Sequence, residues 1–133
     1  MDAPKTSLSY VHRGGSTPLS SLTVDAGFRQ TVERHGSREA IMSIPQGQRI
    51  TYAELDQRVE RIARGLLAMG VHKGDRVGIW STDNAEWIEV QLATARVGAI
   101  LVNINPAYRL EELRHGLALA RVQVLFTIPY FKS

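Results

Sequence analysis

The sequence predicts an α/β fold: a parallel βαβαβ sheet flanked by helices and preceded by a β-hairpin. Three continuous apolar runs of strand length alternate with two helical segments. The strands are expected at RVGIWS (76–81), AILVNI (99–104) and VQVLFTI (122–128), and the helices at 84–98 and 109–120. Parallel strands need such crossovers, which are right-handed, and an apolar run without alternation indicates a strand that helices cover on both faces.

The chain is expected to open with an irregular lead-in over residues 1–22, which are rich in Ser, Thr, Gly and Pro and show no period. One α/β domain is predicted for residues 23–133. Its first element is a short helix, because Val24, Phe28 and Val32 recur at helical spacing and Gly36 provides a stop.

A hairpin and a second helix follow. EAIMSIP and QRITY flank the turn QGQ (46–48), in which glycine favours a tight reversal. Thr51 and Glu54 form a capping-box pattern at the start of a helix that Gly70 ends. The apolar residues along one face of this helix are Leu55, Val59, Ile62 and Leu66.

Three segments are expected at the functional edge of the sheet. Residues 81–84, 103–109 and 127 onward each follow the carboxyl end of a predicted strand. In open parallel sheets, ligands bind outside these ends, where the connecting loops part. Because Asn105 and Pro106 favour a turn, the loop after the second strand is first a shape-setting loop and second a candidate ligand contact.

The composition is that of an ordinary globular domain. The 133 residues carry 16 Lys or Arg interleaved with 13 Asp or Glu, a formal charge of +3, and no basic tract with neighbouring aromatics, which argues against a nucleic-acid partner. No apolar run approaches the roughly 18 residues of a membrane span, so we expect a cytoplasmic protein without a transmembrane segment. Cysteine is absent, which excludes disulfides and a thiol nucleophile.

Common catalytic and phosphate-binding motifs are missing from the sequence. It holds no G-x-G-x-x-G, G-x-x-x-x-G-K-[ST] or G-x-S-x-G. GVHKGDRVG (70–78) precedes a strand instead of opening a helix, so its glycines are interpreted as turn residues. Glu111 and Glu112 are interpreted as partners of a helix dipole, and Trp87 as a packing residue. No metal site is predicted, because the histidines lack ligand spacing: His12, His35, His72 and His115.

Two long stretches carry a resemblance to a known family. TYAELDQRVERIARGLLAMGVHKGDRVGIWSTDNAEWIEVQLATARVGAILVNINPAYRLEELRHGL (51–117) resembles the N-terminal part of adenylate-forming acyl-CoA synthetases. SYVHRGGSTPLSSLTV (9–24) is similar to the start of the medium-chain and fatty-acid CoA ligase branch. The resemblance covers nearly the whole chain, about 9–126, but only about the first quarter of the family's length. It implies that the sheet belongs to the large N-terminal domain of such an enzyme.

The resemblance implies a ligase that uses ATP, Mg²⁺ and coenzyme A. A carboxylate attacks the α-phosphate of ATP, and coenzyme A then displaces AMP from the acyl-adenylate to give a thioester. The family's phosphate-binding loop, aromatic-Thr-Glu element, ribose-binding Asp and mobile lysine have no counterpart here, so no catalytic residue is assigned. We expect the chain alone to be inactive and to bind none of these cofactors tightly.

The same resemblance implies one contact region. In members of the superfamily, the turn after the strand that corresponds to 99–104 lies close to coenzyme A. By resemblance, Pro106, Ala107 and Tyr108 are the residues expected to make this contact here. The chain departs from the family pattern at Arg13, which intervenes after Tyr-Val-His, and at Thr82, where relatives often have Pro. Neither departure affects the chemistry.

Two other interpretations remain open from the sequence. The chain could be a stand-alone, non-catalytic α/β binding or docking module, which the length of the reading frame would test. A flavodoxin-like or receiver-like domain is disfavoured, because the strand ends lack an acidic cluster for magnesium. In the ligase interpretation the sheet is cut midway, which leaves an unpaired strand edge and an unpartnered helix face, so we expect the fragment to self-associate.

Overall fold

The computed structural model describes residues 20–130 and confirms the predicted order of elements. They are α1 (Val24–His35), β1 (Glu39–Ser43), β2 (Gln48–Thr51), α2 (Tyr52–Ala68), β3 (Arg76–Trp80), α3 (Ala85–Val97), β4 (Ile100–Ile104), α4 (Leu110–Ala120) and β5 (Val124–Thr127). The opening stretch that resembles the ligase branch, including Arg13, falls mostly outside the described residues, and the domain boundary stays a prediction. No helix within 20–130 has the length and apolar character needed to cross a membrane.

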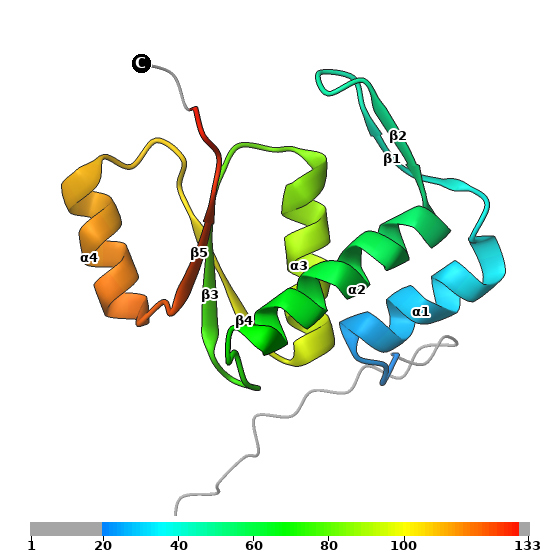
Figure 1. Ribbon diagram of the computed structural model, residues 1–133, viewed down its shortest axis with the longest axis horizontal. Helices are drawn as coiled ribbons and strands as arrows, with labels where there is room; N and C mark the ends of the chain where they lie inside the picture. The colour runs from blue at the N-terminus through cyan, green and yellow to red at the C-terminus, as the bar shows by residue number, and fades with distance from the viewer. Residues whose placement is uncertain (1–19, 131–133) are drawn as a thin grey trace, which may run out of the picture.

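The second half of the chain forms the predicted parallel sheet. β3 lies in the middle and pairs with β4 on one side and β5 on the other, all in parallel. Trp80, the last residue of β3, stands opposite Ile104 and Thr127, so the three strands end at one edge. In Figure 1, α3 lies on one side of the sheet with α2 and α1 beyond it, and α4 lies alone on the other side.

The main core lies between the sheet and the three helices of the first face. The predicted capping box starts α2: the Thr51 hydroxyl accepts from the Glu54 amide, and the Glu54 carboxylate accepts from the Thr51 amide. Of the four apolar residues predicted on one face of α2, all but Ile62 are fully buried, and Ile62 packs against them from the margin. The core cluster also includes Ile50, Val71, Val77 and Ala93.

The hairpin β1–β2 is antiparallel and turns at Gly47, as predicted. Gly47 has φ +62°, a left-handed conformation that glycine adopts without strain from a Cβ atom. Figure 1 shows the hairpin standing away from the sheet, beyond α2 and α3. Each strand of the hairpin buries one apolar residue in the core cluster, Ile41 from β1 and Ile50 from β2. These two contacts hold the hairpin against the rest of the domain.

The prediction that helices bury all three strands holds only for β3. Its middle residues are buried, whereas in β4 only Ile104 is buried and in β5 none is; the other residues of these strands are half-buried or exposed. On the second face α4 is a single helix of 11 residues, too small to cover three strands. Leu110, Leu113 and Leu117 recur at helical spacing along α4, but of these three only Leu113 is buried, and Leu110 at the start of the helix is 75% exposed.

Candidate functional site

Hollows open at the carboxyl edge of the sheet, where the three segments singled out from the sequence lie. The α4-side hollow, about 390 Å³, lies among the end of β3, the β4–α4 loop and the residues after β5. The α3-side hollow, about 400 Å³, lies between the hairpin tip, the start of α3 and the end of β5. A shallower one lies between the ends of β3 and β4. Ser81 lines all three, so the loop after β3 is the centre of the site.

The loop from β3 to α3 is held by its own side chains. Ser81 is 8% exposed; its hydroxyl donates to the Thr82 carbonyl at 2.8 Å and accepts from the Asn84 side-chain amide at 3.0 Å. The Asn84 side-chain oxygen accepts from the Trp87 amide at 2.8 Å, which makes Asn84 the N-cap of α3. The floor of the site is therefore a preformed turn.

Gln46, from the tip of the hairpin, reaches the same loop. Its side-chain oxygen accepts from the Ala85 amide at 2.9 Å and from the Ser43 hydroxyl at 2.8 Å. Its amide nitrogen donates to the Glu86 carboxylate at 2.8 Å. The Ala85 amide is one of the donors that a helix start leaves without an intrahelical partner, so Gln46 acts as a second cap on α3. The sequence placed Gln46 only in a hairpin turn, and no local signal pointed to this contact.

The β4–α4 loop carries the residues for which a coenzyme A contact was predicted. Pro106, Ala107 and Tyr108 line the α4-side hollow, followed by Arg109. The Asn105 side chain closes the turn by accepting from the Ala107 amide at 2.9 Å, as its type suggested. The approach of these residues to coenzyme A stays a prediction.

Trp80 connects this loop to the central strand. Its indole N–H donates to the Asn105 carbonyl at 3.2 Å, and its side chain lines the α4-side hollow. The sequence analysis gave Trp80 no role, although an aromatic residue with a donor at the end of a central strand is a usable signal. Trp87, interpreted as a packing residue, is half-buried and borders the other two hollows.

The carboxylates near the start of α4 do not act as a pair. Glu112 accepts from the Arg109 amide at 2.7 Å, and Glu111 pairs with Arg114 at 3.0 Å. Elsewhere, backbone N–H groups of Thr51 and His72 lower the pKa of Glu54 and Asp75 respectively. Neither of these two carboxyl groups lines a hollow. Within the described residues, no carboxylate lines the α4-side hollow.

The glycines of residues 70–78 lie away from this edge. Gly70 and Gly74 have φ +82° and +89°; Gly70 closes the end of α2, and Gly74 lies in the turn that precedes β3 at its amino end. Gly78 lies inside β3, so its interpretation as a turn residue is wrong. The interpretation of Gly70 and Gly74 as turn residues is confirmed.

Comparison with known proteins identifies the family. The model of the AMP-binding enzyme family matches residues 28–133. Medium-chain acyl-CoA ligase ACSF2 is 45% identical over 98% of this chain in Danio rerio and 38% identical over 100% in Homo sapiens. In both cases the chain spans 22% of the relative's length.

A solved structure agrees with the sequence relatives. The Mycobacterium tuberculosis fatty acyl CoA synthetase is similar with a TM-score of 0.76 and 26% identity, over 79% of this chain and 21% of that one. Both the fold and the sequence thus place residues 28–133 within one group of proteins. The chain belongs to the family of AMP-binding enzymes.

Proposed function

We propose that the chain forms part of an AMP-forming fatty-acyl-CoA ligase that acts on medium-chain acids. The observation that carries the proposal is the match to AMP-binding enzymes over residues 28–133, together with relatives named medium-chain acyl-CoA ligase. In this reaction a carboxylate attacks the α-phosphate of ATP and pyrophosphate leaves. The thiol of coenzyme A then displaces AMP from the acyl-adenylate.

The α4-side hollow supports a contact with coenzyme A. Its volume of about 390 Å³ suits part of a molecule of that size, because ligand pockets span roughly 300–1,000 Å³. Pro106 and Tyr108 offer apolar surface, and Arg109 offers a cation for a phosphate. In the proposal these side chains bind and orient coenzyme A, and none of them transfers a proton.

Magnesium and the triphosphate of ATP do not fit the described part of the chain. Within residues 20–130, no group of three or more His, Asp or Glu side chains is placed to hold a metal ion. The loops that open α3 and α4, STDN (81–84) and NPAYR (105–109), lack the glycines that bring backbone amides close to phosphates. We propose that residues 1–133 alone are inactive.

The activity is tested with the full-length gene product, ATP, coenzyme A and octanoate. We expect acyl-CoA and pyrophosphate to form, and residues 1–133 alone to form neither. Tyr108→Ala in the full-length protein should raise the KM for coenzyme A by about threefold or more while leaving acyl-adenylate formation unchanged. Tyr130→Ala, at an exposed position, is the matched control. Absence of an adenylate with every carboxylate tried would refute the ligase proposal.

We also propose that the isolated chain self-associates. β4 and β5 each pair only with β3 in the described sheet, so their outer edges have no partner strand within residues 20–130. Unpaired strand edges favour pairing between chains. Light scattering of residues 1–133 should report a mass above 14.8 kDa that grows with concentration. A constant monomer mass would contradict this.

The cytoplasmic location remains a proposal as well. Its support is the absence of an apolar run long enough to span a membrane in the sequence. The Danio rerio relative is named as a mitochondrial protein. Imaging the tagged full-length protein would decide between these locations, since a mitochondrial signal would overturn the proposal.

A further inference from the structure

Helix α1 is docked in an unusual way for a helix of a globular domain. None of its 12 residues is buried, although it contacts both α2 and α3. Phe28 supplies its main apolar contact, half-buried against the core cluster. In most proteins the packing of an apolar face provides most of a helix's stability. For α1 that contribution is small, so another interaction must hold it.

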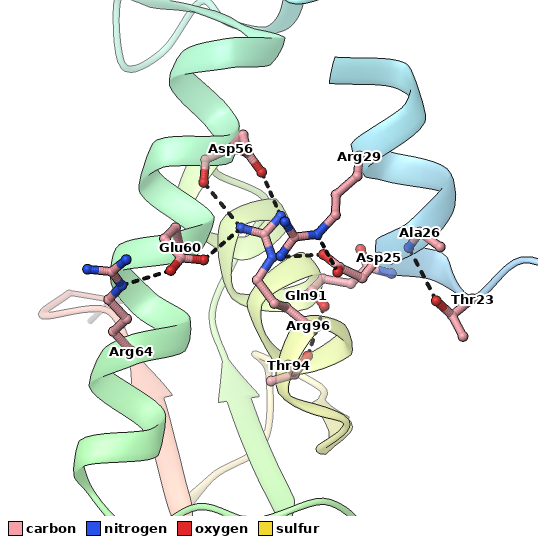
Figure 2. Close-up of polar contacts among 10 residues, drawn as sticks. All are labelled: Thr23, Asp25, Ala26, Arg29, Asp56, Glu60, Arg64, Gln91, Thr94 and Arg96. Carbon is pink, nitrogen blue, oxygen red and sulfur yellow. Dashed lines mark hydrogen bonds and ion pairs between the residues drawn. The ribbon is translucent and has the colours of Figure 1, made fainter. Parts of the chain in front are cut away.

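The guanidinium of Arg96, in the last turn of α3, occupies the junction of the three helices. Its side chain is 6% exposed. It donates to Asp25 of α1 at 2.8 Å, to Asp56 of α2 at 2.6 Å and to Glu60 of α2 at 3.3 Å (Figure 2). The guanidinium carbon also lies 6.0 Å from the centre of the Phe28 ring, within cation–π range.

Two other arginines also pair with these carboxylates, but each pairs with a carboxylate of its own helix. Arg29 pairs with Asp25 at 2.8 Å, and Arg64 pairs with Glu60 at 2.7 Å, each one turn away on the same helix. Figure 2 shows both reaching the cluster from their own helices, whereas Arg96 lies between the helices. Three guanidinium groups thus meet three carboxylates, and in this cluster Arg96 is the group that bridges α1 to α2 and α3.

The cluster keeps its charges despite burial. Burial acts to lower the pKa of Arg96, but hydrogen bonds from it to Asp25 and Asp56 outweigh this and raise the pKa. Burial acts to raise the pKa of Asp25, but hydrogen bonds from Arg29 and Arg96 outweigh this and lower the pKa. A buried cation that loses a carboxylate is strongly penalised, so the Asp25–Arg96 contact favours the docked state.

The segment after α1 is attached to the start of α2. The Gly36 carbonyl accepts from the Ala53 amide at 2.9 Å, and the Arg38 carbonyl accepts from the Tyr52 amide at 3.0 Å. These backbone bonds attach the segment after α1 to the start of α2. The start of α1, where Asp25 lies, is thus the end furthest from this attachment. We propose that α1 is a local opening unit, released from α2 and α3 when the Arg96 bridge breaks while the sheet and the α2–α3 pair stay folded.

Hydrogen exchange measured by mass spectrometry on residues 1–133 tests this proposal. Asp25→Asn removes the charge that Arg96 meets on α1 and keeps the side-chain shape. We expect exchange over residues 24–35 to become about tenfold faster or more, with exchange in α2, α3 and β3 unchanged. Arg29→Met is the matched control, because it removes the partner of Asp25 on the same helix and leaves the bridge intact. We expect Arg29→Met to change the exchange rate over residues 24–35 by less than about threefold.

Arg96→Lys keeps the charge but loses the forked geometry, so α1 should open to a similar degree. For α1, combining Arg96→Lys with Asp25→Asn should add little, because both changes disrupt the same Asp25–Arg96 contact. The proposal is overturned if Asp25→Asn leaves exchange in α1 unchanged. It is equally overturned if Asp25→Asn accelerates α1, α2 and β3 together, because α1 would then open only with the whole domain.

Discussion

The two faces of the parallel sheet are covered by very different amounts of protein. On the first face, α2 and α3 pack a continuous core in which Val59, Leu66 and Val77 have no measurable exposure. On the second face α4 stands alone (Figure 1). There Leu113 and Ile104 are buried, while Leu117 and Leu125 remain half-exposed. Both faces are built from the same strands, in which alternate residues point to opposite sides.

The contrast shows that an apolar strand sequence indicates that the strand can be buried, but not how much of it is buried. Neighbouring residues Val77 and Gly78 in β3 serve different faces: Val77 joins the main core, and Gly78 lies under the side chains of Val122 and Leu125. The extent of burial depends on the number of helices above each face. We therefore expect substitutions on the first face to cost more stability than similar ones on the second.

The largest expected effect comes from shortening a buried leucine on the first face. Leu66→Ala should lower the free energy of unfolding by about 2–5 kcal/mol, because it opens a cavity in a close-packed core. Leu117→Ala on α4 should cost about 1 kcal/mol or less, since water already reaches that site. Urea denaturation followed by circular dichroism measures both, with the exposed Leu119→Ala as control. Equal losses of unfolding free energy for Leu66→Ala and Leu117→Ala would contradict the proposed difference between the two faces.

A smaller effect is expected at Gly78, which lies on the second face of the sheet. A Cβ atom at Gly78 would lie 2.9 Å from Val122 Cγ1 and 3.0 Å from Leu125 Cδ1. Gly78→Ala should cost about 1–2 kcal/mol, because the sparsely covered face can yield outward. Hydrogen exchange should accelerate in α4 and β5 and stay constant in α2.

The matched control for this change is Gly65→Ala in the middle of α2, where a Cβ atom would meet nothing within 4 Å. Alanine favours helix over glycine, so a gain of up to about 1 kcal/mol is expected. Acceleration of exchange in α2 by Gly78→Ala would show that the two faces are coupled.

The smallest expected effect is the loss of stability at low pH that Asp75 causes at the amino edge of the sheet. Asp75 accepts from the His72 amide at 2.7 Å and from the Gln123 side chain at 2.8 Å, which ties the entry to β5 to that of β3. The His72 amide first, and Gln123 second, lower its pKa in the folded state. The contribution of the Asp75 carboxylate to the free energy of unfolding is therefore present above about pH 4, and it is lost as the pH falls toward the folded-state pKa. Urea titrations at several pH values should show a shallower acid loss for Asp75→Asn, and an unchanged slope would contradict this.

Local signals in the sequence were sufficient for the secondary structure. Thr51 and Glu54 specify the start of α2 through groups only three residues apart, and Gly47 specifies its turn by its own conformational freedom. The parallel sheet followed from the alternation of apolar runs and helices. The edge at which the hollows open also followed, because the carboxyl ends of parallel strands share one edge.

Contacts between distant segments were not predictable from local patterns. Gln46 reaches Ala85 across 39 residues, and Arg96 reaches Asp25 across 71. Polar side chains at such positions resemble ordinary surface residues in a sequence. Their roles depend on which helices cross above them, and no spacing rule within one element encodes that crossing.

The sequence by itself determined the helices, the hairpin, the parallel strands and the edge at which the site lies, because caps, turns and hydrophobic periodicity act within a few residues. Tertiary structure alone decided which face of the sheet is well covered, that Gln46 and Trp80 brace the loops of the site, and that Arg96 joins three helices. These outcomes depend on the packing of elements far apart in the chain, where burial changes the energy of a charge or a hydrogen bond that would be weak at the surface.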